Sequence, residues 1–184
     1  SVISHEPSIL YILSGSPRKG GNSDILCDEF LRGAREAGHQ VEKVRPTEKK
    51  IAPCLGCYYC ASHGGECVRR DDMADLLQQM IDADVIVLAS PVYFYSINAQ
   101  LKAVIDRFYA NNDALMGGKK AVLITAMADE AMDSALAGNE MFRQMTGYLN
   151  WENAGVLNAS GASTAADLTK ADLDRAYTMG RELR

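Results

Sequence analysis

Four of the five cysteines in this chain fall within one stretch, "PCLGCYYCASHGGECVRR", which covers residues 53–70. Their spacing is C-x2-C-x2-C-x6-C, and they are Cys54, Cys57, Cys60 and Cys67. Compact cysteine runs supply the thiolate ligands of iron–sulfur clusters. Zinc ribbons separate two C-x2-C pairs by a longer loop, so zinc fits this spacing less well. A disulfide and free thiols stay open as alternatives.

The remaining cysteine and a nearby histidine have simpler explanations. Cys27 stands alone in a helical pattern, which is typical of a buried cysteine that packs as a small hydrophobic residue. His63 lies inside the cysteine run, and we expect an exposed loop residue there rather than a ligand. The candidate metal ligands are therefore the four clustered cysteines.

The composition predicts one globular domain over residues 1–184, with 47% hydrophobic residues and a formal net charge of −5. No apolar run approaches the ~20 residues of a membrane span. No basic stripe offers itself to nucleic acid or to anionic lipid. Residues 1–8, "SVISHEPS", lack the basic and then apolar order of a secretory signal. We expect a cytoplasmic protein, and persistent disulfides are rare in that compartment.

Short apolar runs alternate along the chain with segments of helical periodicity. Strands are predicted at residues 9–13, 40–46, 84–90, 119–127 and 154–162, and helices at residues 23–38, 70–83, 97–111, 129–151 and 165–183. Buried strand runs that alternate with helices indicate a parallel sheet covered on both faces. The pattern predicts an α/β fold: a flavodoxin-like, doubly wound sheet of five parallel strands in the order 2-1-3-4-5.

Ligands of such folds bind outside the carboxyl ends of the strands, at the switch point between the first and third strands. The loop after the first strand, "SGSPRKGGNS" at residues 14–23, leads into a helix N-terminus. Unpaired backbone N–H groups there favour an anion, and the loop adds hydroxyls, an amide and Arg18. The Lys-Ser/Thr of a P-loop and a G-x-G-x-x-G fingerprint are both missing. A terminal monophosphate fits better, and a plain Ser/Gly-rich turn is the alternative.

Three consecutive aromatic residues, Tyr93, Phe94 and Tyr95, follow the third strand in its exit loop. Aromatic side chains at a switch point suit a flat ring that stacks on them or meets them edge-on. Local packing of one or two of these rings is the alternative. Together with a phosphate site, the pattern indicates a phosphorylated planar heterocycle, namely FMN.

The segments "GSPRKGGNS", "PCLGCYYC…GECV", "DDM" and "ASPVYFYSINAQLKAVIDR" resemble the NADPH-dependent FMN reductase family of flavodoxin-like proteins, and within it the branch that includes the iron–sulfur flavoproteins. The resemblance covers about residues 8–128, and the C-terminal third matches only in outline. It implies an FMN-binding, often oligomeric oxidoreductase that uses NAD(P)H or another electron donor. Members of that branch carry a C-x2-C-x2-C-x4–7-C motif that binds a [4Fe–4S] cluster, and the present spacing satisfies it.

The resemblance also implies site residues. Those expected around the FMN phosphate are Ser14, Ser16, Pro17, Arg18, Gly21, Asn22 and Ser23. Those expected along the isoalloxazine are Pro91, Val92, Tyr93, Phe94, Tyr95 and Ser96, with Thr125 and Ala126 at a third loop. The cofactor carries the redox chemistry in such proteins, so no catalytic acid or base is assigned.

The expected function is an NAD(P)H oxidoreductase that passes electrons through FMN to a quinone, flavin or protein acceptor, with a possible relay through a [4Fe–4S] cluster. A non-enzymatic electron carrier that exchanges electrons with ferredoxin is the alternative, and a cofactor-free scaffold is a third. We expect a homodimer or tetramer, and no nucleic-acid or membrane partner.

Overall fold

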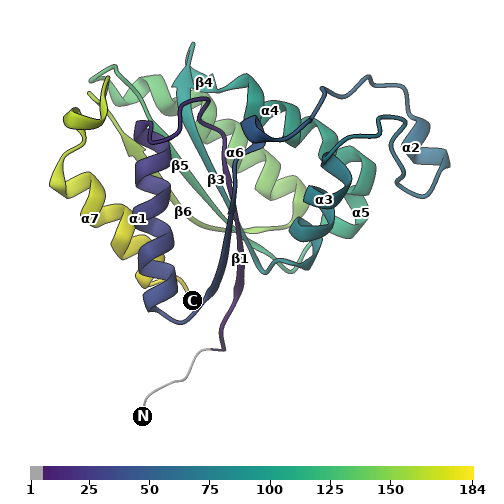
Figure 1. Ribbon diagram of the computed structural model, residues 1–184, viewed down its shortest axis with the longest axis horizontal. Coiled ribbons are helices and arrows are strands. Elements are labelled where there is room, and N and C mark those ends of the chain that lie inside the picture. Colours follow the sequence, from purple (N-terminus) through teal and green to yellow (C-terminus); the bar gives the residue numbers. More distant parts are fainter. Residues whose placement is uncertain (1–5) are drawn as a thin grey trace.

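Five parallel strands form the central sheet of the computed structural model, which describes residues 6–184 (Figure 1). They are β1 (Ile9–Ser14), β2 (Gln40–Val44), β3 (Val85–Tyr93), β5 (Lys120–Ala126) and β6 (Glu152–Ala159), in the order β2-β1-β3-β5-β6. A short strand, β4 (Ser96–Ile97), pairs antiparallel with the end of β3. The predicted order of five parallel strands is confirmed.

Helices cover both faces of the sheet, which explains why its inner strands are apolar without alternation. On one face α1 (Asn22–Glu36) and α7 (Lys170–Arg181) lie side by side (Figure 1). On the other face lie α3 (Met73–Asp82), α4 (Ala99–Asp106) and α6 (Leu136–Leu149). Each face therefore has its own buried apolar cluster, and residues along β1, β3 and β5 contribute alternately to the two.

Shorter elements modify the predicted helices. The helix predicted at residues 97–111 is α-helical only over α4, which ends at Asp106. The chain then continues through η2 (Arg107–Asn111) into α5 (Asn112–Leu115). The helix predicted at residues 129–151 starts as η3 (Met132–Ala135) and becomes α-helical only in α6. The helix predicted at residues 165–183 starts as η4 (Ala165–Asp167) and becomes α-helical in α7. Two short helical turns were not predicted: η1 (Pro46–Glu48) and α2 (Tyr59–Ser62).

The segment expected to be an exit loop after the third strand is part of a hairpin instead. β3 continues to Tyr93, and its partner β4 begins at Ser96. Phe94 and Tyr95 make the turn with φ values of 46° and 66°. The left-handed region is uncommon for bulky residues, because the side chain crowds the backbone there.

Two expectations concern the chain as a whole. Among residues 6–184, no helix has both the length and the apolar character needed to cross a membrane. The expected absence of a secretory signal falls mostly on residues 1–5, which lie outside the described residues.

Candidate functional site

The loops that follow β1 and β3 are tied to each other at the carboxyl edge of the sheet. The Gly15 N–H donates to the Ala89 carbonyl at 2.8 Å, and the Asn98 side-chain amide donates to the Gly15 carbonyl. The Ser90 hydroxyl donates to the Asn98 side-chain oxygen at 3.0 Å and accepts from the Asn98 N–H at 2.9 Å. A Cβ at Gly15 would lie 2.8 Å from the Cβ of Leu101, so only glycine fits this close approach.

A buried carboxylate, that of Asp24, holds the loop after β1 through hydrogen bonds. It accepts from the Ser14 hydroxyl at 2.5 Å and from the Gly20 N–H at 2.8 Å. Lys43 lies 2.7 Å away and Arg45 lies 3.0 Å away, both from the end of β2. Burial alone would raise the pKa of Asp24, but hydrogen bonds from Lys43, Ser14 and Gly20 outweigh it and lower that pKa to about 2. The Ser14 hydroxyl is thus already used within the protein.

The start of α1 leaves hydrogen-bonding capacity unused. Its N-cap is Gly21, which offers no side-chain cap, and the helix begins at Asn22. The Ser23 hydroxyl is buried at 1% exposure and has no hydrogen-bond partner among residues 6–184, and the Asn22 side-chain oxygen also lacks one there. The Asn22 amide donates to the Ala162 carbonyl at 2.6 Å, which brings the loop after β6 to this helix end. Unpaired donors at a helix N-terminus fit an anion such as a phosphate group.

The other residues expected around the phosphate flank this helix end. The Ser16 hydroxyl is buried and donates to the Arg18 carbonyl at 2.9 Å. Pro17 and Arg18 are exposed, while Gly21 is buried. Arg45 donates to the Ser16 carbonyl at 3.1 Å, which fixes the loop from the side of β2.

The hairpin presents its aromatic residues to solvent. Pro91 is buried, and Val92 and Ser96 are half-buried. Exposure rises to 42% at Tyr93, 99% at Phe94 and 64% at Tyr95. A strained turn that carries a fully exposed aromatic ring gains nothing from packing within the chain, and such outliers cluster at ligand sites.

The third expected loop places its side chains differently. Thr125 and Ala126 lie at the end of β5 and are buried. The Thr125 hydroxyl donates to the Asn158 side chain of β6 at 2.6 Å. Neither side chain is therefore open at the sheet edge, although Ala126 lies in register with Pro91, just before the aromatic turn.

Sequence reasoning missed Asp24 and Asn98. Asn98 is the N-cap residue of α4, and asparagine before a periodic apolar segment is a recognisable helix-start signal. Asp24 lies in the first turn of α1, where an acidic residue reads only as favourable to the helix dipole. Its partners from β2 become evident only once the sheet is assembled.

The four clustered cysteines line a single cavity of about 390 Å³, together with Tyr58, Tyr109 and Asp106. None of the four forms a disulfide, and Cys54 and Cys57 are exposed. Within the described residues, no three His, Cys, Asp or Glu side chains converge closely enough to hold a single metal ion. The four thiols nevertheless line one cavity, and cysteine thiolates are the ligands that iron–sulfur clusters use.

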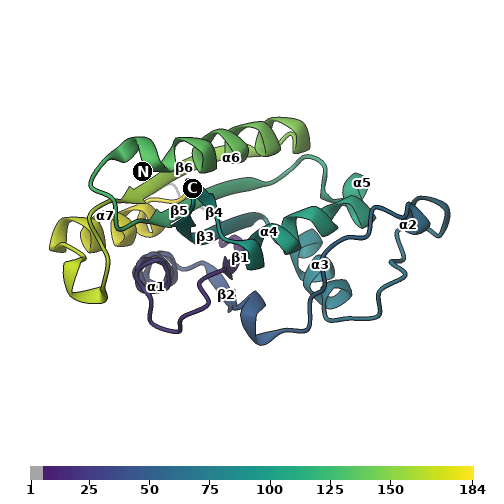
Figure 2. The same ribbon diagram turned by 90° about the horizontal axis from the view of Figure 1, so that it is seen from above.

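The cysteine loop, residues 53–70, projects from the molecule beyond α3 and α5 (Figures 1 and 2). Its contacts are with η2: Tyr58 meets Tyr109 edge-on at a centroid distance of 5.9 Å, and Gly65 approaches the Ala110 carbonyl. His63 stacks on Tyr59 at 3.7 Å and is exposed, and it is not among the cavity-lining residues.

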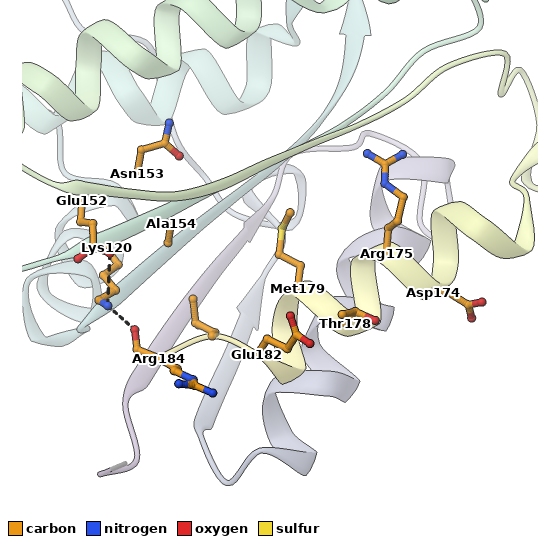
Figure 3. Close-up of a pocket in the computed structure, with 11 residues that line it drawn as sticks. Lys120, Glu152, Asn153, Ala154, Asp174, Arg175, Thr178, Met179, Glu182 and Arg184 are labelled. Carbon is orange, nitrogen blue, oxygen red and sulfur yellow. Dashed lines mark hydrogen bonds and ion pairs between the residues drawn. The ribbon is translucent and has the colours of Figure 1, made fainter. Parts of the chain in front are cut away.

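A larger cavity of about 730 Å³ lies at the opposite edge of the sheet, between α7 and the first residues of β5 and β6 (Figure 3). Its charged side chains have mixed signs. Lys120 pairs with Glu152 at 3.5 Å and donates to the Arg184 carbonyl. Because ligands of doubly wound sheets bind at the carboxyl ends of the strands, this cavity is not the candidate site.

Comparison with curated proteins finds iron–sulfur flavoproteins from Archaeoglobus fulgidus. One is 44% identical over 105 residues, which cover 56% of this chain and 47% of the relative. Another is 36% identical over 160 residues, which cover 85% of this chain and 77% of the relative. The chain thus spans about half the length of the first of these relatives and over three quarters of the second.

Among solved structures, an NAD(P)H:quinone oxidoreductase from Methanothermobacter marburgensis superposes with a TM-score of 0.75. It is 19% identical, and the match covers 97% of each chain. At that identity the likeness speaks for the fold. The sequence family described as NADPH-dependent FMN reductase matches residues 7–156. A match of that extent, with the iron–sulfur flavoproteins as relatives, shows that this chain belongs to the NADPH-dependent FMN reductase family.

Proposed function

We propose that this chain is an FMN-dependent NAD(P)H oxidoreductase. The observation that carries the proposal is the buried, unpartnered Ser23 hydroxyl at the uncapped start of α1. A buried polar group without a partner costs free energy, so it calls for a ligand atom. A phosphate oxygen is the acceptor that the surrounding donors fit best.

The residues after β1 would hold the phosphate of FMN. Ser23, the Asn22 backbone N–H and the exposed Arg18 would supply donors and positive charge. The Gly21 N–H already donates to the Arg18 carbonyl at 3.1 Å. Asp24 supports them indirectly, because it fixes the loop through Ser14 and Gly20. Its own charge is balanced by Lys43 and Arg45, so the loop does not repel an anion.

The hairpin of β3 and β4 would line the isoalloxazine. Tyr93, Phe94 and Tyr95 offer exposed ring surface there. Stacking on a flavin would give those rings the burial that they lack within the chain. When bound, FMN would supply the hydride and electron chemistry that links NAD(P)H to an acceptor. The residues of this chain bind and orient the cofactor, and we assign none of them a proton-transfer role.

The cysteine loop would hold a [4Fe–4S] cluster through Cys54, Cys57, Cys60 and Cys67. The shared cavity supports this assignment, and so do relatives that are named iron–sulfur flavoproteins. A protein acceptor would then receive single electrons, whereas a quinone or free flavin could be reduced at the flavin itself. We also propose a cytoplasmic homodimer or tetramer, to be checked by light scattering.

Affinity for FMN against riboflavin tests the phosphate site. The wild-type protein should bind FMN at least about tenfold more tightly, because hydrogen bonds to a charged group are worth more than neutral ones. Ser23→Ala should remove about tenfold of FMN affinity and leave riboflavin affinity unchanged. Ser62→Ala, at an exposed serine of α2, is the matched control. Equal affinity for the two flavins would contradict the proposal.

Anaerobic oxidation of NADPH or NADH by the FMN-loaded protein tests the reductase activity. Turnover with a quinone or ferricyanide is the expected result. Flavin binding without turnover would instead favour the second candidate, an electron carrier that exchanges electrons with ferredoxin, which the names of the relatives also allow. No flavin binding would contradict both.

Anaerobic purification followed by iron and sulfide analysis tests the cluster. The expected result is about four irons per chain, the iron content of one [4Fe–4S] cluster. Broad visible absorption should appear beneath the flavin bands. Flavin bands without iron would contradict the cluster and leave the FMN site intact.

A further inference from the structure

The cysteine loop leaves the fold and returns to it at one point. The Ala52 N–H donates to the Asp71 carboxylate at 3.0 Å. One pair further from the loop, the Lys50 N–H donates to the Asp72 carboxylate at 2.7 Å and the Asp72 N–H donates to the Lys50 carbonyl at 2.9 Å. These two adjacent pairs close the neck of residues 53–70.

A buried arginine of η2 also binds both ends of this neck. Arg107, at the start of η2, is only 2% exposed. Its guanidinium donates to the Ala52 carbonyl at 2.8 Å and makes a two-pronged contact with Asp71 at 2.8 and 3.0 Å. Such a planar fork fixes geometry as well as charge. Arg107 therefore joins both ends of the loop to the end of α4, which packs on the sheet.

The same guanidinium lies near the two cysteines that are closest to the neck in the sequence. Cys54 follows Ala52 by two residues, and Cys67 precedes Asp71 by four. Burial alone would lower the pKa of Arg107, but the hydrogen bonds to Asp71 outweigh it, and the proximity of Cys67 and Cys54 raises that pKa further. Arg107 therefore lies close to the two cysteines that flank the neck, as well as to the neck itself.

We propose that Arg107, held in place by Asp71, is a positioning residue for the four-cysteine site: it closes the neck of the loop and so sets where Cys54 and Cys67 enter the shared cavity. The inference rests on the cluster proposed above. Outer residues that orient metal ligands commonly change metal affinity by about 10–100-fold when they are removed.

Iron retention tests this role. Wild type, Arg107→Gln and Arg107→Lys are loaded anaerobically with ferrous iron and sulfide, and iron loss to a chelator is timed. Arg107→Gln should lose iron about tenfold faster than wild type, and Arg107→Lys should lie between them. Arg70→Gln is the matched control, since Arg70 belongs to the same loop but is 72% exposed and pairs with Glu66, which is also exposed. Equal retention by Arg107→Gln and wild type would overturn the proposal.

Amide hydrogen exchange of the iron-free protein gives a readout that does not depend on the cluster. Exchange over residues 53–70 should quicken about tenfold in Arg107→Gln, and FMN affinity should not change. Unchanged exchange would overturn the neck closure even where iron is lost. If wild type binds no iron, the proposed cluster is wrong, and exchange alone decides on the neck. The double variant Asp71→Asn/Arg107→Gln removes both charges together and serves if the single variant does not fold.

Discussion

The loop after β1 and the cysteine loop both lack long regular structure, and both gather residues that suit a bound group, but they are held in opposite ways. In the first, Ser14 and Ser16 are buried, and the neighbouring elements hold the chain at several points. In the second, Cys54 and Cys57 are exposed, and the polar contacts are concentrated at the neck.

The difference teaches where the cost of ordering each site falls. The loop after β1 is ordered by the sheet and by α1, so folding itself prepares this region before any ligand binds. The cysteine loop gains little from the core, so a metal group would supply much of its order, as in other sites where binding and folding are coupled. Changes in the first loop should therefore alter the stability of the ligand-free protein, while changes in the second should not.

The largest expected effect is that of Asp24→Ala. The substitution leaves Lys43 and Arg45, with side chains 16% and 9% exposed, without their shared carboxylate. Removing one partner of a buried ion pair costs about 3 kcal/mol of unfolding free energy. Urea unfolding of the FMN-free protein measures it. Asp28 is the other partner of Lys43, and its side chain is 57% exposed. Asp28→Ala should therefore cost less than about 1 kcal/mol. Equal losses would break the comparison.

The pH dependence of the same carboxylate gives the next effect. The folded-state pKa of Asp24 is about 2, below its ordinary value of 3.8, so its contribution is complete above the ordinary value. That contribution, about 2 kcal/mol, is lost as the pH falls through the folded pKa. The unfolding free energies of wild type and Asp24→Asn should converge between about pH 4 and pH 2, the interval from the ordinary pKa to the folded-state pKa. A constant difference across it would contradict the assignment.

Two cysteine substitutions test the comparison between buried and exposed thiols. Cys27→Ser places a hydroxyl on the buried face of α1 and should cost about 1–2 kcal/mol of unfolding free energy. Cys57→Ser should change the stability of the iron-free protein by less than about 0.5 kcal/mol. Burial also raises the pKa of the Cys27 thiol. Alkylation of the native iron-free protein should accordingly modify the four loop thiols and spare Cys27.

The smallest expected effect belongs to Phe94→Asn. Asparagine tolerates the left-handed region better, and a side chain that is 99% exposed contributes no burial, so stability should rise by up to about 1 kcal/mol. FMN affinity should fall at the same time. Tyr148→Asn removes an exposed aromatic residue from α6 and is the control. It should not raise stability and should not lower FMN affinity. A loss of stability in Phe94→Asn would show that its ring packs within the folded chain.

The inner strands could be predicted from the sequence, because a strand buried on both faces is a continuous apolar run. Their order followed from the doubly wound fold that alternating strands and helices predict. β1, β3 and β5 are such runs, and the loops that follow them were found by the same rule. The hairpin escaped prediction because nothing in Phe94-Tyr95 suggests a turn with positive φ, which usually calls for glycine or asparagine.

The supports of the two sites could not be predicted, because they join residues far apart in the chain. Arg107 reaches Asp71 and Ala52 across separations of 36 and 55 residues. Within a helical pattern Arg107 looks like any solvent-facing arginine. Its burial follows from the end of α4 at Asp106, where the chain turns toward the neck of the cysteine loop.

The closed neck has a further consequence for how this protein could be rebuilt. Because Ala52 and Asp71 are hydrogen-bonded to each other, residues 53–70 occupy the place of an insertion: the chain departs and resumes at the same position. A short turn could join the two ends without moving β2 or α3. The segment that carries the four thiols could therefore be transferred to another protein. That protein would need a hydrogen-bonded pair of residues like Ala52 and Asp71 at the point of insertion.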